Sequence, residues 1–213
     1  KGPKSLGSIR IKPLRKDALL LGSDQPLAKV IQVIPNQIVT KKMVKRILLK
    51  EGVACPNLKE DILKIAVVER HKATGNIGIG FVQGFGLREG AIGSSVAHDS
   101  HNIVIVGTND QDMLKAVETI KAMGGGLVAI SNGKILASLP LPIAGLMSDA
   151  SVTRVHLELE TLRRAARTIG CKLPDPFMTL SFLALPVIPE LKITDKGLVD
   201  VNQFKFVPLF GEE

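Results

Sequence analysis

The chain has 213 residues, of which 45% are hydrophobic, and it carries a formal net charge of +8 at pH 7. This composition excludes a disordered chain and allows one large domain or two small ones. No apolar run reaches the ~18 residues of a membrane span, so we expect no membrane partner. The charged first residues lack the hydrophobic segment of a secretory signal, and we expect a cytoplasmic protein.

The positive charge does not indicate a nucleic-acid partner. Two basic clusters, at residues 41–46 and 163–167, have the spacing of solvated helix faces. The chain contains no Trp and no Tyr, so the stacking platforms of a single-strand binder are missing, and we expect no nucleic acid. The two cysteines, Cys55 and Cys171, are interpreted as free thiols rather than as a disulfide framework.

The first quarter of the chain predicts short extended elements. Residues 1–8 are expected to form a mobile lead to a domain of residues 9–213. An opening strand is predicted at residues 8–12, and a second strand at residues 29–34, where a proline follows. Thr40 is predicted to cap a short turn of helix, because a threonine hydroxyl can accept from the next backbone amides.

The centre of the chain predicts a buried sheet. The run at residues 62–68 is almost unbroken in its apolar character and is typical of a strand buried on both faces. Residues 78–82 predict a strand whose glycines permit close approach of another backbone. Residues 90–97 fit a strand or a helix, whereas residues 103–106 predict an interior strand.

Two long helices and a hairpin are predicted next. Residues 110–123 repeat apolar side chains at helical spacing, with Asn109 or Asp110 as the cap. Residues 126–139 predict a hairpin that turns at an Asn-Gly pair. Residues 151–169 form an amphipathic pattern that a glycine ends.

The remaining chain predicts irregular and extended structure. We interpret residues 140–150 as a turn-rich connection, residues 175–176 as a turn and residues 197–210 as a terminal strand. Because only two long helices accompany many strands, the sequence predicts an α+β fold. We expect a layered domain with a mixed, largely antiparallel β-sheet and a few covering helices.

The densest polar cluster lies in the glycine-rich stretch of residues 80–110. It consists of His98, Asp99, His101 and Asn102. In a helical turn the two histidines could share a metal ion, but two histidines and one carboxylate are fewer ligands than a closed site needs. The alternative is that these side chains form hydrogen bonds within the structure or line a pocket.

A second candidate cluster directly follows the buried strand at residues 62–68. Glu69, Arg70 and His71 stand where strand ends often present functional groups, although a solvated charged pair is an equally ordinary interpretation. The glycines of residues 80–86 do not match a phosphate-binding motif. Ser94 and Ser95 lack the surrounding motif of an activated nucleophile, and we interpret them as packing residues.

Several long strings resemble one known family. They are DILKIAVVERH, TGNIGIGFVQGFGLREGAIGSSVAHDSHNIVIVGTND, LASLPLPIAGLMSD and DPFMTLSFLALPVIPELKITDKGLVDVNQFKFVPLF. Together they are similar to the C-terminal domain of bacterial and archaeal adenine deaminase, of the amidohydrolase superfamily. The resemblance covers residues 9–210.

This resemblance implies a metal-dependent hydrolysis of adenine to hypoxanthine and ammonia. In the family, manganese or iron is held by histidines and an aspartate of a (β/α)₈ barrel that precedes this domain, and it activates a water molecule. A chain of 213 residues has no room for a barrel of ~250 residues besides this domain, and it contains no H-x-H motif. We therefore expect no cofactor in this chain and no deaminase activity from it alone.

The resemblance also leaves three hypotheses about the role of the domain. In the first, the segments 69–71 and 98–102 face the mouth of the barrel and help to close the site over adenine. In the second, the chain is a non-catalytic module for subunit association, with residues 177–188 and the apolar tail as interface of a homo-oligomer. In the third, His98, Asp99 and His101 hold a metal ion of a self-contained hydrolase.

Overall fold

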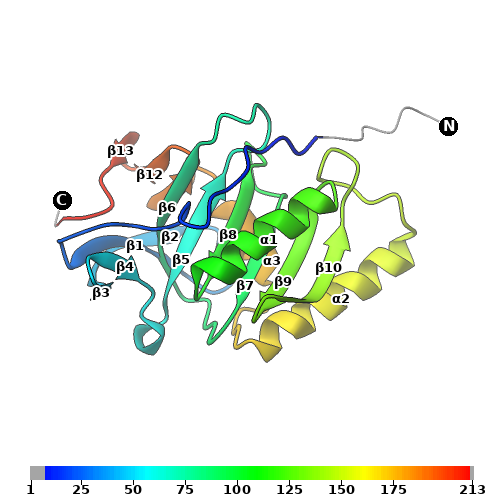
Figure 1. Cartoon of the computed structure of the whole chain (residues 1–213), viewed down its shortest axis with the longest axis horizontal. Helices are drawn as coiled ribbons and strands as arrows, with labels where there is room; N and C mark the ends of the chain where they lie inside the picture. Colours follow the sequence, from blue (N-terminus) through cyan, green and yellow to red (C-terminus); the bar gives the residue numbers. More distant parts are fainter. Residues whose placement is uncertain (1–7, 212–213) are drawn as a thin grey trace.

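The computed structural model describes residues 8–211, and Figure 1 shows a large twisted sheet covered on both faces. The predicted mobile lead falls, except for Ser8, outside the described residues. The large sheet has the order β10-β9-β7-β8-β5-β6-β1-β2, and smaller sheets are formed by β11-β12-β13 and β3-β4. Within residues 8–211 no helix is both long and apolar enough to cross a membrane.

The bounds of the elements, in chain order, are as follows: β1 Leu27–Val33, β2 Thr40–Arg46, β3 Leu48–Lys50, β4 Val53–Cys55, a 3₁₀ turn at Leu58–Glu60, β5 Ile62–Val68, β6 Ile77–Gln83, β7 Ala91–Ser94, β8 Ile103–Gly107, α1 Asp110–Ala122, β9 Gly126–Ser131, β10 Lys134–Pro140, α2 Val152–Thr168, α3 Pro176–Phe182, β11 Leu191–Thr194, β12 Gly197–Asp200 and β13 Lys205–Val207.

The large sheet is mixed and mostly antiparallel. In the described part of the chain, β1 and β6 form its parallel pair, and the other neighbours run antiparallel. The predicted α+β fold is therefore confirmed. The sheet is mixed because β6 has two kinds of neighbour. It runs antiparallel to β5, which it follows through a short loop, and parallel to the much earlier strand β1.

Strand β5 lies in the middle of this sheet, and all seven of its residues are buried. Leu63, Ile65 and Val67 point to one face, whereas Ala66 and Val68 point to the other. The prediction of a strand buried on both faces is confirmed, because an apolar run interrupted only by Lys64 supplies both faces of the strand with core residues.

Helices and a second sheet cover the two faces. Helix α1 packs with β7, β8 and β9 on one face, whereas α2, α3 and strands β11 and β12 cover the other. Figure 1 shows α1 crossing in front of the sheet and α3 behind it. Both long helices begin where the sequence predicts, because the side chain of Asn109 accepts from Asp112 N and that of Ser151 accepts from Arg154 N.

Glycine allows the C-terminal sheet to lie directly on the large one. A Cβ atom at Gly78 in β6 would overlap the carbonyl oxygen of Thr194 at the end of β11. The predicted close backbone approach at residues 78–82 is confirmed. Because any side chain at position 78 would push the two sheets apart, this glycine fixes their spacing.

Three local predictions were wrong. Residues 8–12 are not a strand, although Arg10 N donates to Arg70 O, because this segment runs along the sheet end without a ladder partner. Thr40 begins the edge strand β2 instead of capping a helical turn. The basic cluster at residues 41–46 therefore belongs to a strand, where outward lysines protect a sheet edge from further pairing.

The C-terminal quarter contains more regular structure than predicted. Helix α3 begins at Pro176, where the sequence predicts a turn. The carboxylate of Asp175 accepts from Met178 N, and Pro176 occupies the first helical position. This cap followed by proline is a start signal for a helix. The tail contributes two strands, β12 and β13, rather than one.

Candidate functional site at the polar end of the central sheet

The seven candidate residues meet at one end of the sheet. Strands β5 and β8 are antiparallel, with Val68 opposite Ile103. The segment that follows β5 therefore lies beside the segment that precedes β8, although about 30 residues separate them in sequence. Strand pairing, rather than sequence proximity, brings the two clusters together.

Glu69 organises the loop after β5. Its buried carboxylate accepts hydrogen bonds from the backbone amides of His71 at 2.5 Å, Lys72 at 2.7 Å and Thr74 at 2.8 Å, and from the Thr74 hydroxyl at 3.0 Å. Burial opposes the negative charge, but these bonds outweigh it and lower the pKa of Glu69 to about 2. The carboxylate is fully engaged within its own loop.

Arg70 holds three segments together from inside the protein. The side chain is buried, and its guanidinium donates to the main-chain carbonyls of Ser8 at 3.3 Å, Ala144 at 3.1 Å and His101. Burial lowers the pKa of Arg70. The planar fork of donors suits this task, because each of its three nitrogens donates to a different carbonyl. Arg70 thus positions the loops of the site and does not face an open cavity.

Asn102 links the site to the C-terminal sheet. Its buried side-chain oxygen accepts from Arg70 N at 3.3 Å, and its amide nitrogen donates to the carboxylate of Asp195 at 3.2 Å. Asp195 also accepts from the side chain of Asn76 at 3.2 Å. Sequence analysis missed Asp195, which lies 93 residues from Asn102 and in no recognisable motif.

Three histidines, His71, His98 and His101, lie at the same sheet end as Glu69 and Arg70. His71 is exposed and donates from Nε2 to Ser100 O at 2.6 Å. His101 is half-buried, and its Nδ1 accepts from Ala97 N at 3.2 Å, which places the proton of the neutral ring on Nε2. Burial, followed by the nearby His98 and Arg70, lowers the pKa of His101 and favours this neutral form.

His98 and Asp99 form the tip of the site. The rings of His98 and His101 lie edge to face with centroids 5.6 Å apart, and His98 packs against Phe182 of α3 with a centroid distance of 4.9 Å. His98 is half-buried, and Asp99 is exposed. Such a pair of groups can exchange hydrogen bonds or protons with a molecule that approaches the tip.

The described residues do not fit a metal centre. Within residues 8–211, no three His, Cys, Asp or Glu side chains are grouped so as to hold a metal ion. Nδ1 of His101 is also used by a backbone amide. The residues at this end of the sheet therefore supply hydrogen-bonding and proton-accepting groups without a ligand set for a metal.

The other polar candidates have structural partners. The Ser95 hydroxyl donates to Gly145 O at 2.6 Å and accepts from Gly126 N at 2.8 Å, which fixes the loop after β10. In the glycine-rich loop, Gly84 N and Gly86 N donate to the carboxylate of Asp61 at 3.1 Å and 2.7 Å. These backbone amides bind a carboxylate of the protein itself, and the spacing of the glycines alone does not indicate this role.

Fold and site define the class of protein: an α+β domain that gathers three histidines at one end of its large sheet. The family model described as the adenine deaminase C-terminal domain matches residues 37–205, and the chain belongs to this family. An adenine deaminase of Desulfatibacillum aliphaticivorans is 61% identical over 183 residues, which are 86% of this chain and 32% of the relative.

Two other relatives are also matched over nearly all of this chain but over only about a third of their own length. An adenine deaminase of Dehalococcoides mccartyi is 52% identical over 97% of this chain and 36% of its own length. One of Methanothrix thermoacetophila is 52% identical over 94% of this chain and 35% of its own length. The chain spans about a third of the length of the curated relatives that it matches.

Proposed function

We propose that this chain acts as the C-terminal domain of a metal-dependent adenine deaminase that converts adenine and water to hypoxanthine and ammonia in the cytoplasm. Two observations together support the proposal. The chain matches the family model of this domain, and relatives named adenine deaminase contain the matching region as about a third of their length. The catalytic manganese or iron then belongs to a separate barrel domain of the amidohydrolase superfamily.

The polar sheet end is the part of this domain that faces the active site. Glu69, Arg70 and Asn102 are fully used in holding the loops in place. This scaffold presents His98 and Asp99 to the outside. A rigid framework that carries a few exposed polar groups is the arrangement that orients a substrate or closes a site over it.

An assay of the isolated chain tests whether adenine hydrolysis requires the separate barrel domain. Purified residues 1–213, loaded with manganese or iron, should not convert adenine to hypoxanthine, whereas the full-length enzyme should. Absorbance of the purine follows the reaction. Hydrolysis by the isolated chain above the rate with metal alone would contradict the proposal and would favour a self-contained hydrolase at His98, Asp99 and His101.

Alanine substitutions test the role of the tip. In the full-length enzyme, His98→Ala and Asp99→Ala should lower kcat/KM by at least about tenfold if these groups assist proton transfer or binding. The midpoint of thermal unfolding should change little. His156→Ala is the matched control, because His156 is exposed on α2. Turnover equal to that of the control would rule out the proposed role.

Subunit association is the second candidate function. Phe204 and Phe206 on the tail are 77% and 57% exposed, so two aromatic side chains close together in sequence are available to a partner. A stable dimer of the isolated chain in light scattering, lost in Phe204→Ser, would favour this role. A monomer at all concentrations would exclude it.

A further inference from the structure

The last turn of helix α3 is attached to the loop that carries His98. The backbone amide of His98 donates to the carbonyl of Ser181 at 2.9 Å, and the ring of Phe182 packs against the imidazole of His98 with a centroid distance of 4.9 Å. Both contacts come from neighbouring residues of the helix and reach the same residue of the loop. His98 is therefore held by α3 at its backbone and at its ring.

Two rings restrict the imidazole of His98. The ring of Phe182 is tilted by 44° against it, and the ring of His101 meets it edge to face at 66° with a centroid distance of 5.6 Å. Aromatic rings attract each other in tilted and edge-to-face geometries at such distances. Rotation of the imidazole to another staggered rotamer would give up both contacts, so they favour a single orientation of the ring.

Helix α3 is itself fixed at both ends. The side chain of Asp175 caps its first turn, and Leu180 on its inner side is fully buried in the core. Directly after the helix, the carbonyl of Leu183 accepts from Ile193 N of β11 at 3.1 Å. A short helix that is capped, buried on one side and bonded to a neighbouring sheet gives Phe182 a defined position.

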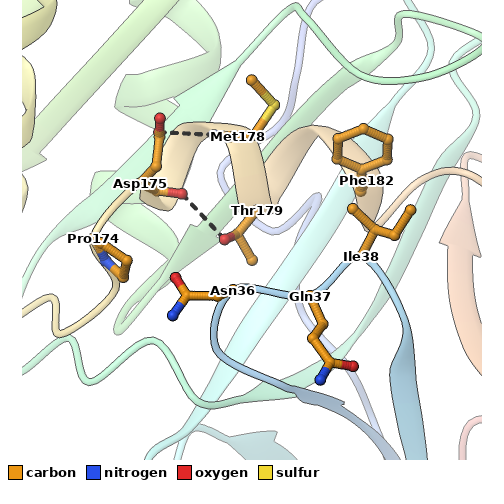
Figure 2. Close-up of a pocket in the computed structure, with 8 residues that line it drawn as sticks. All are labelled: Asn36, Gln37, Ile38, Pro174, Asp175, Met178, Thr179 and Phe182. Atoms are coloured by element: carbon orange, nitrogen blue, oxygen red, sulfur yellow. Dashed lines mark hydrogen bonds between the residues drawn. The ribbon is translucent and has the colours of Figure 1, made fainter.

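Phe182 is only half-buried, unlike the aromatic residues of the core. It lines a groove of about 280 Å³ between α3 and the turn that precedes β2, and Figure 2 shows it beside Ile38 at one end of this groove. A side chain that remains partly in contact with water contributes less to the core than a fully buried one. Its replacement by a smaller apolar side chain should therefore leave the domain folded.

We propose that Phe182 is a positioning residue, which holds the imidazole of His98 in the orientation in which it serves the active site. The inference rests on the proposed function, in which His98 is one of the two groups that the scaffold presents. It adds to that function a residue from α3, far from His98 in sequence. Because Phe182 acts through His98 and does not touch the substrate, the two rings should contribute to turnover as one unit.

Carbon-13 relaxation of the histidine rings in the isolated chain tests the positioning directly, and with four histidines the signals are simple to assign. Phe182→Leu and Phe182→Met keep an apolar side chain but remove the ring. Both should lower the order parameter of the His98 ring from about 0.85, typical of a rigid group, towards about 0.6. Thermal unfolding checks that both variants fold.

Two further variants serve as controls for the relaxation measurement. Phe182→Tyr retains the ring and should retain the order of His98. Met178→Leu changes an apolar residue of the same helix that lines the same groove and is 55% exposed, and it should also leave His98 ordered. An unchanged order parameter of the His98 ring in the two variants without a ring at position 182 would overturn the proposal.

A double-mutant cycle in the full-length enzyme tests whether Phe182 acts through His98. Phe182→Leu alone should lower kcat/KM by about two- to tenfold, the range that corresponds to the strength of one aromatic pair. In a His98→Ala background the same substitution should have no further effect, because the ring that Phe182 positions is absent. An equal loss in both backgrounds would overturn the proposal, since a purely structural effect of Phe182 does not depend on His98.

The positioning role and the proposed function fail in different ways. If His98→Ala turns over adenine as fast as the control His156→Ala, the role of the tip in the reaction is contradicted, whereas a loss of His98 order without the Phe182 ring still supports the contact between the two residues. If His98→Ala lowers turnover but His98 stays ordered without that ring, the proposed function stands and the positioning role is refuted.

Discussion

Replacement of Arg70 tests whether the polar sheet end is a rigid scaffold. Arg70→Met removes the guanidinium but keeps an unbranched apolar side chain in place of the arginine stem. Three main-chain carbonyls, those of Ser8, His101 and Ala144, then lose their donor. Arg70→Lys keeps the charge, but one ammonium group cannot reach three carbonyls as the planar guanidinium does.

The expected loss follows from these bonds. Each buried polar group left without a partner costs about 1–3 kcal/mol, so three of them would cost several kcal/mol. Removing a charge from a side chain that is 1% exposed offsets part of this loss, because the desolvation cost of the charge disappears. A net destabilisation of about 3 kcal/mol remains, which corresponds to a decrease of about 6–12 °C in Tm for a chain of this size.

Thermal and urea unfolding of the isolated chain measure this loss directly. Arg15→Met is the matched control, because the Arg15 side chain is 83% exposed and pairs with Asp17 on the surface. Arg70→Lys should fall between the wild type and Arg70→Met. If Arg70→Met and Arg15→Met unfold at the same temperature, the guanidinium has no structural role, and Arg70 again becomes a candidate for contact with substrate.

Two further substitutions test individual parts of the scaffold. The lowered pKa of Glu69, from 4.5 to about 2, contributes stability that is fully present above about pH 4.5 and is lost as the pH falls towards 2. Glu69→Gln should therefore be less stable by about 1–3 kcal/mol at pH 7 and should show a shallower loss in acid; identical acid profiles in urea unfolding would refute this. Gly78→Ala should cost about 2–3 kcal/mol because its Cβ atom meets Thr194 O, whereas Gly22→Ala has open space and should cost little. Similar unfolding midpoints for these two alanine variants would contradict the close packing of the sheets.

The sequence predicted the parts of the fold that local physics determines. The doubly buried strand β5, the capped helices α1 and α2 and the Asn132-Gly133 hairpin all follow from apolar spacing, side-chain caps or turn chemistry. Helix α3 carries equally local signals, an aspartate cap and a proline at the first position, and these signals are sufficient to predict its start.

The arrangement of the candidate site depended on long-range pairing. The types of residue at Glu69, Arg70 and Asn102 indicated a polar site, but they did not reveal that all three hold the loops in place. Glu69 binds amides of its own loop, but Arg70 and Asn102 have partners at Ser8, Ala144 and Asp195 that are far away in sequence. Only the pairing of β5 with β8 and the packing of the C-terminal sheet bring these partners within reach, so no local pattern could show that Arg70 and Asn102 belong to the scaffold rather than to the exposed tip.

Distances from the metal ion in the full-length enzyme test most directly whether the polar sheet end faces the active site. Spin labels are placed at Ser100→Cys, beside the tip, and at Lys59→Cys, at the opposite end of β5, in a Cys55→Ser background. Electron paramagnetic resonance of the manganese-loaded enzyme then gives the two distances from label to metal. Because seven strand residues span about 20 Å, the label at position 100 should lie nearer to the metal by about that length. Equal distances, or a nearer label at position 59, would contradict the account.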